Sequence, residues 1–446
     1  MMKTPIFDFV KKYAESDTTR FHMPGHKGKS FLGCEAYDLT EISGADTLYS
    51  ADGIIDESER NATELFNTGR TFYSTEGSTL GVRAMLALAL SGAPKNKRPT
   101  VLAARGAHKA FLSTAALLDF DVEWILSEKN THIASAAVSA REVRAALSSV
   151  DKPAAVYLTS PDYLGNISPI EEISAVCRDF GVPLLVDNAH GAYLAFLEPS
   201  LHPIALGADM CCDSAHKTLP ALTGGAYLHI SKNAARYIPS ARGKLSLFAS
   251  TSPSYLILES LDLCNKYLDS GYRKRLSETV KNVSEIKDLI RGCGLSVSEG
   301  EPLKIVIMPR SFGYTGTELS EYLRKEGIEA EFSDSEYTVL MITPENDGRD
   351  LSRLVSAVKA LKQRPCLSPF SETVEIEIPE RAMSVRDAML AESETVAVRD
   401  SIGRVVAVPT ASCPPAVPIA VSGEVIDGKV AELLIKYGIE SIEVVK

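Results

Sequence analysis

The stretch DMCCDSAHKTLPALTGG, residues Asp209–Gly225, contains a lysine, Lys217, between a histidine and a threonine. Ser214 lies three residues before this lysine, and a Gly-Gly pair that starts at Gly224 follows it. A lysine on a glycine-flanked loop, with hydroxyl groups and an imidazole nearby, suits a Schiff base with an aldehyde cofactor that carries a phosphate. The alternative is an exposed lysine in a turn between two strands.

A second stretch upstream, VPLLVDNAHG, favours the cofactor interpretation. It is a short apolar run that ends in Asp187, with His190 three residues further on and glycines at positions 181 and 191 on either side. Such a run indicates a buried parallel strand, whose carboxyl end is where open α/β sheets bind ligands. A buried aspartate there needs a cationic partner, and a protonated pyridine nitrogen is one. Alternatively, Asp187 caps the next helix.

The segment between residues 154 and 191 has the pattern of a complete strand–helix–strand unit. Ala155–Thr159 is expected to be a strand, SPDYLG the loop after it on the substrate side, and Ile170–Phe180 the crossover helix that Gly181 ends. Repetition of this unit predicts an α/β fold with a mostly parallel sheet and helices on both faces.

Three motifs together resemble the Orn/Lys/Arg decarboxylase family: FHMPGHKG, VDNAHG and SAHKTLPALT. The similarity runs in order from about His22 to Val425. It implies the aspartate-aminotransferase-like fold type I of pyridoxal 5'-phosphate (PLP) enzymes, with a mostly parallel large domain and smaller α+β domains after it. It also implies the compact form of the family, without the additional amino-terminal domain of its large members.

The segment FYSTEGSTLGVRAMLALAL is expected to form the phosphate site. Residues 71–74 suit a strand end, Glu76–Thr79 a small loop, and Val82–Leu90 a helix of strong propensity. Backbone N–H groups and hydroxyls at a helix start bind anions. Gly77, Ser78 and Thr79 are therefore the predicted phosphate ligands, although a plain helix cap would explain the two hydroxyls equally well.

The resemblance assigns further roles. His108 is the imidazole that stacks on the pyridine ring, and Asp187 keeps the ring nitrogen protonated. Lys217 carries the cofactor, and His216 or Lys217 returns a proton to the α-carbon. Thr251 and Ser252 approach the phosphate of a neighbouring subunit. The full set of expected cofactor ligands is Gly77, Ser78, Thr79, His108, Asp187, Ala189, His190, Ser214, His216 and Lys217.

The sequence departs from the family pattern at a few places. Gly224 stands where the family has glutamine, Asn188 where glutamate is common, and Asp162-Tyr163 replaces Thr-Tyr-Gly-like residues. Near the carboxyl end, Cys413–Pro418 reads CPPAVP where the family has an aromatic residue followed by Pro-Pro-Gly-Ile-Pro. These departures concern the substrate and the activity more than cofactor binding.

The chain is expected to contain four parts. They are an amino-terminal arm (1–20), a PLP-binding large domain (21–253), a small α/β domain (254–364) and a carboxyl-terminal decarboxylase-like domain (365–446). A long helix, roughly Ser254–Arg291, is predicted to lead into the small domain, and Pro365–Pro369 is predicted to be a linker.

Composition limits the possible partners. Hydrophobic residues make up 45% of the chain and charged residues 24%, which is typical of a globular protein. The net charge of 47 − 58 = −11 argues against nucleic acid and is compatible with a cationic substrate. No signal peptide or membrane span is expected. The eight scattered cysteines favour free thiols in the cytoplasm, and no metal site is expected because Met-Pro-Gly separates His22 from His26.

The predicted activity is PLP-dependent decarboxylation of a basic L-amino acid to an amine and CO2, as in polyamine biosynthesis. Arginine is favoured because the compact family members include biosynthetic arginine decarboxylases, while lysine and ornithine remain open. The resemblance also implies a homodimer or a higher homo-oligomer. Two alternatives are another fold type I PLP enzyme, such as an aminotransferase or lyase, and a PLP-binding protein with little catalysis.

Overall fold

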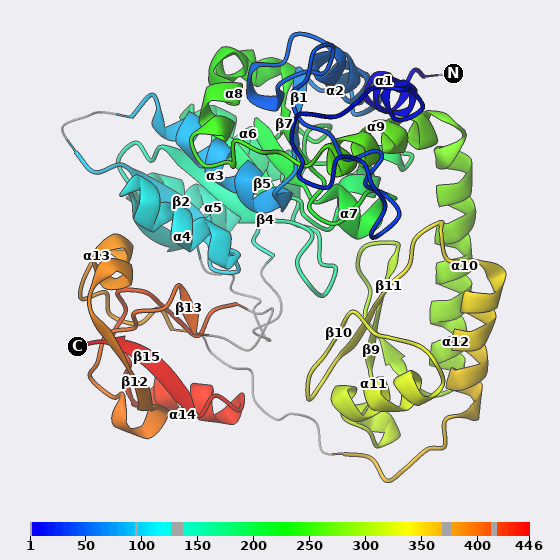
Figure 1. The fold of residues 1–446 in the computed structure, drawn as a ribbon. Helices are drawn as coiled ribbons and strands as arrows, with labels where there is room; N and C mark the ends of the chain where they lie inside the picture. The colour runs from blue at the N-terminus through cyan, green and yellow to red at the C-terminus, as the bar shows by residue number, and fades with distance from the viewer. Residues whose placement is uncertain (1, 94–96, 126–136, 368–376, 412–416) are drawn as a thin grey trace.

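The computed structural model describes residues 2–93, 97–125, 137–367, 377–411 and 417–446. In Figure 1 a large sheet with its helices occupies the upper part of the molecule. A smaller sheet lies at the lower right and the carboxyl-terminal elements lie at the lower left. None of the described helices combines the length and the apolar character that crossing a bilayer requires.

The large sheet has seven strands in the order β1-β7-β6-β5-β4-β2-β3. Strand β7 runs antiparallel to both of its neighbours, and the other pairs are parallel. The expected α/β fold with a mostly parallel sheet is therefore confirmed. The strands are β1 (Arg70–Ser74), β2 (Thr100–Ala104), β3 (Asp121–Ile125), β4 (Ala155–Thr159), β5 (Leu184–Asp187), β6 (Met210–Asp213) and β7 (Ala226–Ile230).

Helices cover both faces of this sheet. Alternate strand residues point to opposite faces, so Val101 and Tyr157 pack with α3, α4 and α8, whereas Leu102 and Leu158 pack with α5 and α6. Burial on both faces explains why the strands are almost continuously apolar. The helices are α2 (Ile54–Leu65), α3 (Gly77–Leu90), α4 (Lys109–Leu118), α5 (Ala140–Ser149), α6 (Ile170–Phe180), α7 (Ala215–Thr218) and α8 (Ile238–Ser246).

Two helices differ from the sequence expectation. Helix α3 begins at Gly77 rather than at Val82, although Gly, Ser and Thr have weak helix propensity. Contacts with the lysine loop support this first turn, because the N–H of Gly77 donates to the carbonyl of Gly224 at 2.8 Å. The predicted long helix is two helices, α9 (Tyr255–Asp269) and α10 (Tyr272–Gly292), because Gly271 between them has a φ of +76°.

The smaller sheet is antiparallel, with the strand order β10-β11-β9-β8. Figure 1 shows α10 and α12 alongside it, and α11 below. Its elements are β8 (Ser296–Val297), β9 (Lys304–Met308), α11 (Gly316–Lys325), β10 (Phe332–Ser333), β11 (Thr338–Met341) and α12 (Gly348–Ala360).

The carboxyl-terminal region contains two small antiparallel pairs, β12 with β15 and β13 with β14. Residues 413–416 of the departure at Cys413–Pro418, and residues 368–369 of the predicted linker, lie outside the described residues. The elements are α13 (Val385–Leu390), β12 (Ser393–Ala397), β13 (Thr410–Ala411), β14 (Ala420–Val421), α14 (Gly428–Lys436) and β15 (Ser441–Val445). Short 3-10 helices occur at Leu48–Ser50, Ala192–Phe196, Lys232–Tyr237, Arg310–Phe312 and Val398–Asp400.

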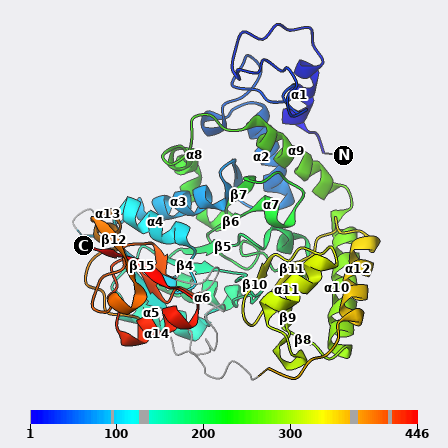
Figure 2. The ribbon, with the colours of Figure 1, turned by 60° about the horizontal axis from the view of Figure 1, so that its bottom comes forward.

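The amino-terminal helix α1 (Pro5–Ala14) is held against α9 by a buried carboxylate. The side chain of Asp262 accepts hydrogen bonds from the backbone N–H groups of Ile6 and Phe7, at 3.0 Å each, so it satisfies two free donors of the helix start. After α1 the chain projects from the body of the molecule, as the dark blue segment in Figure 2 shows.

Candidate active site

The centre of the site is the carboxyl end of β5, where Asp187 is 3% exposed. Its carboxylate accepts a hydrogen bond from the hydroxyl of Tyr157 at 3.1 Å and faces the thiol of Cys212 at 3.7 Å. Both donors are neutral. Among the described residues, no lysine, arginine or histidine forms an ion pair with Asp187. A buried carboxylate without a cation is costly, so this position suits a cationic ligand atom.

Lys217 lies on α7, directly after the neighbouring strand β6. Its Nζ is 3.0 Å from Nε2 of His190. The side chain is accessible to solvent, but enough protein surrounds the amine for burial to lower the pKa of Lys217, against the opposing effect of Asp187. A lowered pKa increases the fraction of free amine, which is the form that attacks an aldehyde.

His190 lies between two amines. Lys217 is on its Nε2 side, and Nζ of Lys304, the first residue of β9, is 3.5 Å from its Nδ1. Burial, followed by the charges of Lys304 and Lys217, keeps the pKa of His190 well below its usual value. The imidazole is therefore neutral, and it connects the lysine loop to the smaller sheet.

His108 precedes α4 and caps it, since its Nδ1 accepts the backbone N–H of Ala110 at 3.2 Å. The side chain is exposed, which leaves ring surface open to a ligand. Desolvation by the surrounding protein lowers the pKa of His108; Asp187 opposes the shift and Lys217 adds to it. Strand β2, which leads to His108, belongs to the same parallel set as β5, so both reach the same edge of the sheet.

The first turn of α3 meets the lysine loop directly. The hydroxyl of Ser214 donates to Oγ of Ser78 at 2.9 Å, and the N–H of Gly77 donates to Gly224. The turn itself has no acidic residue, and the side chain of Glu76 at the N-cap does not cap it but accepts the N–H of Ser250, so no side chain caps the first N–H groups of α3. Gly77, Ser78 and Thr79 are half-buried. The structure thus brings the predicted phosphate residues beside the loop that holds Lys217.

The remaining predicted residues differ in how they relate to this centre. Nδ1 of His216 is 3.0 Å from the carbonyl oxygen of Gly225, which makes this nitrogen the donor and leaves Nε2 as an acceptor. Ala189 is half-buried between Asn188 and His190. Thr251 and Ser252 are exposed and touch none of the other predicted residues through a described hydrogen bond, although the neighbouring Ser250 donates its N–H to Glu76.

The departure at Asn188 has a local physical reason. Its side-chain amide donates to the carboxylate of Asp213 at 2.7 Å. The same carboxylate also accepts from His202 at 3.0 Å and His229 at 3.2 Å. Although burial favours the protonated acid, the two imidazoles hold the pKa of Asp213 below its usual range. A glutamate at position 188 would face this carboxylate, whereas the asparagine provides a donor.

His202, Cys211 and Asp213 place possible ligand atoms within 4.8 Å of one another. Hydrogen bonds account for this cluster, because Nδ1 of His202 faces the backbone N–H of Ile204 at 3.4 Å, which leaves Nε2 to carry the hydrogen donated to Asp213. We therefore describe the cluster as a hydrogen-bonded support for the end of β6.

Comparison with known proteins identifies the family. A family model described as Orn/Lys/Arg decarboxylase, major domain, matches residues 4–309. The chain belongs to the Orn/Lys/Arg decarboxylase family. It is 29% identical to an arginine decarboxylase of Bacillus subtilis and 30% identical to one of Halalkalibacterium halodurans, in both cases over 95% of this chain and 91% of the relative.

Solved structures support the same fold. A lysine decarboxylase of Francisella novicida aligns with a TM-score of 0.82 at 16% identity, over 99% of this chain and 81% of that one. The constitutive lysine decarboxylase of E. coli aligns with a TM-score of 0.81 over 100% and 82% of the two chains, also at 16% identity. The protein is an amino acid decarboxylase, and its cofactor is PLP.

The residues present fit this cofactor. Among the described residues, the buried carboxylate of Asp187 has only neutral donors, so the N–H⁺ of a pyridine ring would supply the cation that it lacks. The amine of Lys217 has a lowered pKa and lies near it, and the uncapped first turn of α3 suits a phosphate. The protein thus offers a negative group to the ring nitrogen of the cofactor, and the N–H groups of a helix start to its phosphate.

Sequence reasoning did not identify the groups that the smaller sheet contributes. Lys304 is 3% exposed and forms an ion pair with Glu301 at 2.7 Å, and Glu301 accepts from the hydroxyl of Tyr193 at 2.8 Å. The hydroxyl of Tyr163 donates to Glu331 at 2.8 Å. A lysine that opens an apolar strand is usually solvated, and only the packing of the two sheets buries Lys304.

The departure at Gly224 generates a stability prediction. Gly224 has a φ of +99°, and a Cβ there would lie 2.9 Å from the backbone oxygen of Thr75. We expect Gly224→Ala to lower the free energy of unfolding by about 1–2 kcal/mol, the cost of a left-handed conformation for an L-residue. Denaturant titration of the Trp124 fluorescence measures this loss.

Gly243→Ala is the matched control. Gly243 lies within α8, and a Cβ there meets no atom within 4 Å. We expect this change to be neutral or to stabilise by about 0.5–1 kcal/mol. Equal unfolding free energies for the two variants would contradict the role assigned to Gly224.

Proposed function

We propose that the protein decarboxylates a basic L-amino acid, with arginine as the first choice and lysine or ornithine as alternatives. The observation that carries the proposal is the amine of Lys217, 3.0 Å from Nε2 of the buried His190, on the strand end next to the buried carboxylate of Asp187, which has no ion-pair partner among the described residues. Relatives named arginine decarboxylase that match 95% of the chain support arginine. Such a reaction would belong to polyamine biosynthesis.

Each predicted residue has a role in this proposal. When bound, PLP supplies an aldehyde that combines with amines and a ring that accepts the electrons released with CO2. Lys217 would hold the cofactor through its amine, Asp187 would accept the hydrogen of the ring nitrogen, and the exposed ring of His108 would lie against the cofactor ring. Gly77, the hydroxyls of Ser78 and Thr79, and the side chain of Ser214 would bind the phosphate, while Ala189 and His190 would contact the cofactor near Lys217.

Two groups are positioned to handle the proton of the reaction. After CO2 leaves, the α-carbon needs a proton from a nearby acid. Lys217 is one candidate, and the neutral His190 next to its amine can relay a proton to it. His216 is the other, because its Nδ1–H is occupied by Gly225 and its Nε2 remains able to bind and release a proton.

We also assign the side chain of the substrate to a carboxylate of the smaller sheet. The ring of Tyr163 packs edge-on against His190, with centroids 5.1 Å apart, and its hydroxyl binds Glu331. The negative charge of Glu331 acts on Lys217, where it opposes the lowering of the pKa. A carboxylate on this side of the site complements the distal cation of a basic amino acid. Tyr163 belongs to the loop in which the sequence departs from the family.

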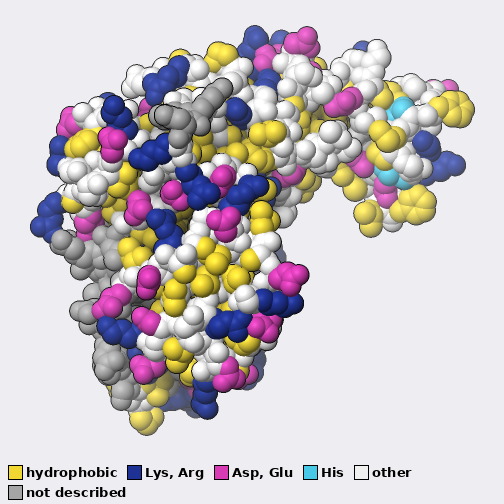
Figure 3. All heavy atoms as spheres, turned by 90° about the vertical axis from the view of Figure 1, so that its left-hand side faces the viewer, with side chains coloured by type: hydrophobic (Ala, Val, Ile, Leu, Met, Phe, Trp, Pro, Cys, Tyr) yellow, Lys and Arg dark blue, Asp and Glu magenta, His cyan; other side chains and the backbone are white. Residues whose placement is uncertain are grey.

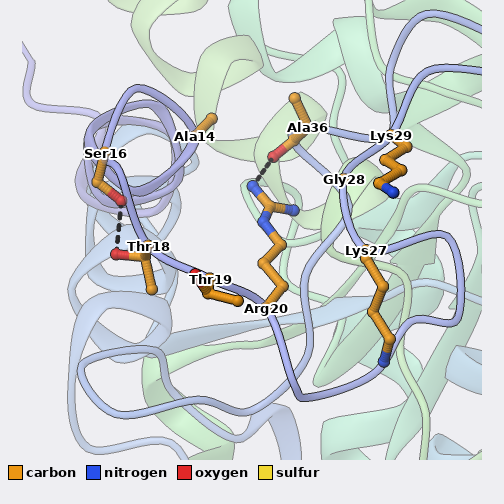
Figure 4. Close-up of a pocket in the computed structure, with 9 residues that line it drawn as sticks. All are labelled: Ala14, Ser16, Thr18, Thr19, Arg20, Lys27, Gly28, Lys29 and Ala36. Atoms are coloured by element: carbon orange, nitrogen blue, oxygen red, sulfur yellow. Dashed lines mark hydrogen bonds between the residues drawn. The ribbon is translucent and has the colours of Figure 1, made fainter.

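The protein is proposed to act as a homodimer or a larger homo-oligomer. The projecting segment after α1 exposes apolar side chains, including Phe21 (93%), Phe31 (80%) and Leu32 (90%), and Figure 3 shows apolar atoms gathered on this projection. A hollow of about 430 Å³ lies along it, where Arg20 binds the carbonyl of Ala36 (Figure 4). Exposed apolar clusters mark interaction sites, and we assign this one to a second copy.

Two further proposals follow from the family and the thiols. The exposed residues Thr251 and Ser252 would reach the phosphate bound by the second copy. The described cysteines all have free thiols, which suits a reducing cytoplasm.

The decarboxylase proposal is tested with arginine, lysine and ornithine in turn, by measuring CO2 and amine. We expect CO2 from one of them, and no measurable turnover by Lys217→Ala, because alanine has no amine to hold the cofactor. Lys232→Ala is the control, since Lys232 is an exposed lysine bound to Asn67. Near-normal CO2 release by Lys217→Ala, or a keto acid in place of the amine, would refute the proposal.

The assignment of Glu331 predicts an effect on substrate affinity. Glu331→Gln should raise KM for the basic amino acid by about 10-fold with a smaller change in kcat, since a charge-assisted hydrogen bond contributes about 1.5–3 kcal/mol. Steady-state kinetics measures both constants.

Glu329→Gln is the control for this change. Glu329 lies two residues away and pairs with Arg324 on the surface. The assignment is wrong when both variants change KM equally, or when neither does.

The oligomer proposal is tested by sedimentation of the holoenzyme. The double change Phe31→Asp and Leu32→Asp should halve the mass of the wild-type particle, whereas Leu390→Asp, at a residue 69% exposed on α13, should not. A monomeric wild-type protein would contradict the proposal, as would a double variant that keeps the wild-type mass.

A further inference from the structure

The turn that carries His108 is short and begins at a buried arginine. Arg105 follows β2 directly, and its N–H donates to the carbonyl of Ile125 at 3.3 Å, which continues the pairing of β2 with β3. Only Gly106 and Ala107 separate Arg105 from His108. The position of the imidazole therefore depends on how this turn is held.

The side chain of Arg105 has no exposed surface, and the carboxyl-terminal region binds all three of its nitrogen atoms. Nη1 and Nη2 donate to the two carboxylate oxygens of Glu424, at 2.6 and 2.7 Å. Nε donates to the carbonyl of Pro418 at 3.2 Å, and Nη2 also donates to that of Ile419 at 3.3 Å. The guanidinium lies 4.9 Å from the ring centroid of Trp124. Such a bidentate arrangement fixes direction as well as distance.

Glu424 is fixed from its own side as well. Its Oε2 accepts the N–H of Val421 at 2.8 Å, and its backbone carbonyl accepts the N–H of Val406 at 2.9 Å. The side chain is 3% exposed. The ion pair thus joins two rigid parts of the molecule and is shielded from water.

The carboxyl-terminal region also holds the far end of the helix that His108 caps. Arg386 of α13 donates to the carbonyl of Ala116 in the last turns of α4, at 2.8 Å. Val385 and Val421 belong to the same apolar cluster as Ala107 and Phe111. Helix α4 and the turn before it are therefore clamped at both ends by residues far along the chain (Figure 1).

We propose that Glu424 is a positioning residue of the cofactor site: through its bidentate pair with Arg105 it fixes the turn that aims His108 at the pyridine ring. This inference rests on the proposed role of His108. It makes the carboxyl-terminal region, which lies beyond the matched major domain, part of the machinery that binds PLP. A change at Glu424 should alter the cofactor although Glu424 does not touch it.

The test measures the PLP dissociation constant, the visible circular dichroism of bound PLP, and kcat and KM of the holoenzyme. We expect Glu424→Gln to weaken PLP binding by about 10-fold, as for other groups that orient a ligand-binding residue. It should also change the dichroism and lower kcat more than it raises KM. Arg105→Lys keeps the positive charge but loses the bidentate pair of hydrogen bonds, so it should show the same pattern. This variant still tests the proposal when Glu424→Gln does not fold.

The matched control is Arg381→Gln. Arg381 also joins the carboxyl-terminal region to the large sheet, through Glu123 at 3.2 Å and the carbonyl of Val122 at 2.9 Å, but this pair is exposed and distant in sequence from His108. PLP binding and kcat of this variant should stay within about twofold of wild type, as for an ordinary surface ion pair.

A double-mutant cycle separates positioning from general stability. In a His108→Ala background, Glu424→Gln should cause no further loss of PLP affinity, because its effect passes through the imidazole. An equal loss in both backgrounds would overturn the inference, as would wild-type PLP affinity and dichroism in Glu424→Gln or Arg105→Lys. These outcomes leave the proposed function intact, whereas wild-type protein that binds no PLP would overturn both.

Discussion

The carboxylate of Asp187 is the constraint around which the site is built. A charge buried at the end of a central strand is tolerated only with compensation, yet its described partners are a hydroxyl and a thiol. Strands β4 and β6 lie on either side of β5 and run parallel to it. Their carboxyl ends, and the lysine loop that follows β6, therefore lie around the carboxylate of Asp187. In the proposed function, the protonated ring of the cofactor would supply the positive charge that these partners lack.

One strand away, Asp213 shows the opposite solution. Its carboxylate is fully buried, but His202, His229 and Asn188 all donate to it within the protein. This carboxylate therefore supports the start of the lysine loop and does not need a ligand. The two buried aspartates on adjacent strands thus differ in their partners, and this difference is why we propose Asp187, and not Asp213, as a cofactor ligand.

Two histidines, His190 and His108, connect this site to other parts of the chain. Burial and the charges of two neighbouring lysines keep the pKa of His190 well below its usual value, and its ring lies between Lys304 of the smaller sheet and Lys217. His108 is held from the other side by the carboxyl-terminal region through Arg105. Groups from three parts of the chain thus converge on one edge of the large sheet.

Much of this arrangement could be predicted from local sequence. The strand Ala155–Thr159 and the helix Ile170–Phe180 have the expected bounds, because an apolar run, a helical period and a terminal glycine each have a local physical cause. The start of α3 was not predicted, since a contact with Gly224 outweighs the weak propensity of its first residues. Lys304, Glu331 and the Arg105–Glu424 pair were also missed, because their roles depend on packing between segments far apart in the chain.

The most direct test of the account is to find which lysine holds the cofactor. Borohydride reduction of the PLP-loaded protein makes that link permanent, and peptide mass spectrometry then locates it. The account predicts the pyridoxyl group on Lys217. Lys304 is the alternative that this experiment has to distinguish, because its amine lies on the other side of the imidazole of His190. A pyridoxyl group on Lys304, or on neither residue, would contradict the central claim.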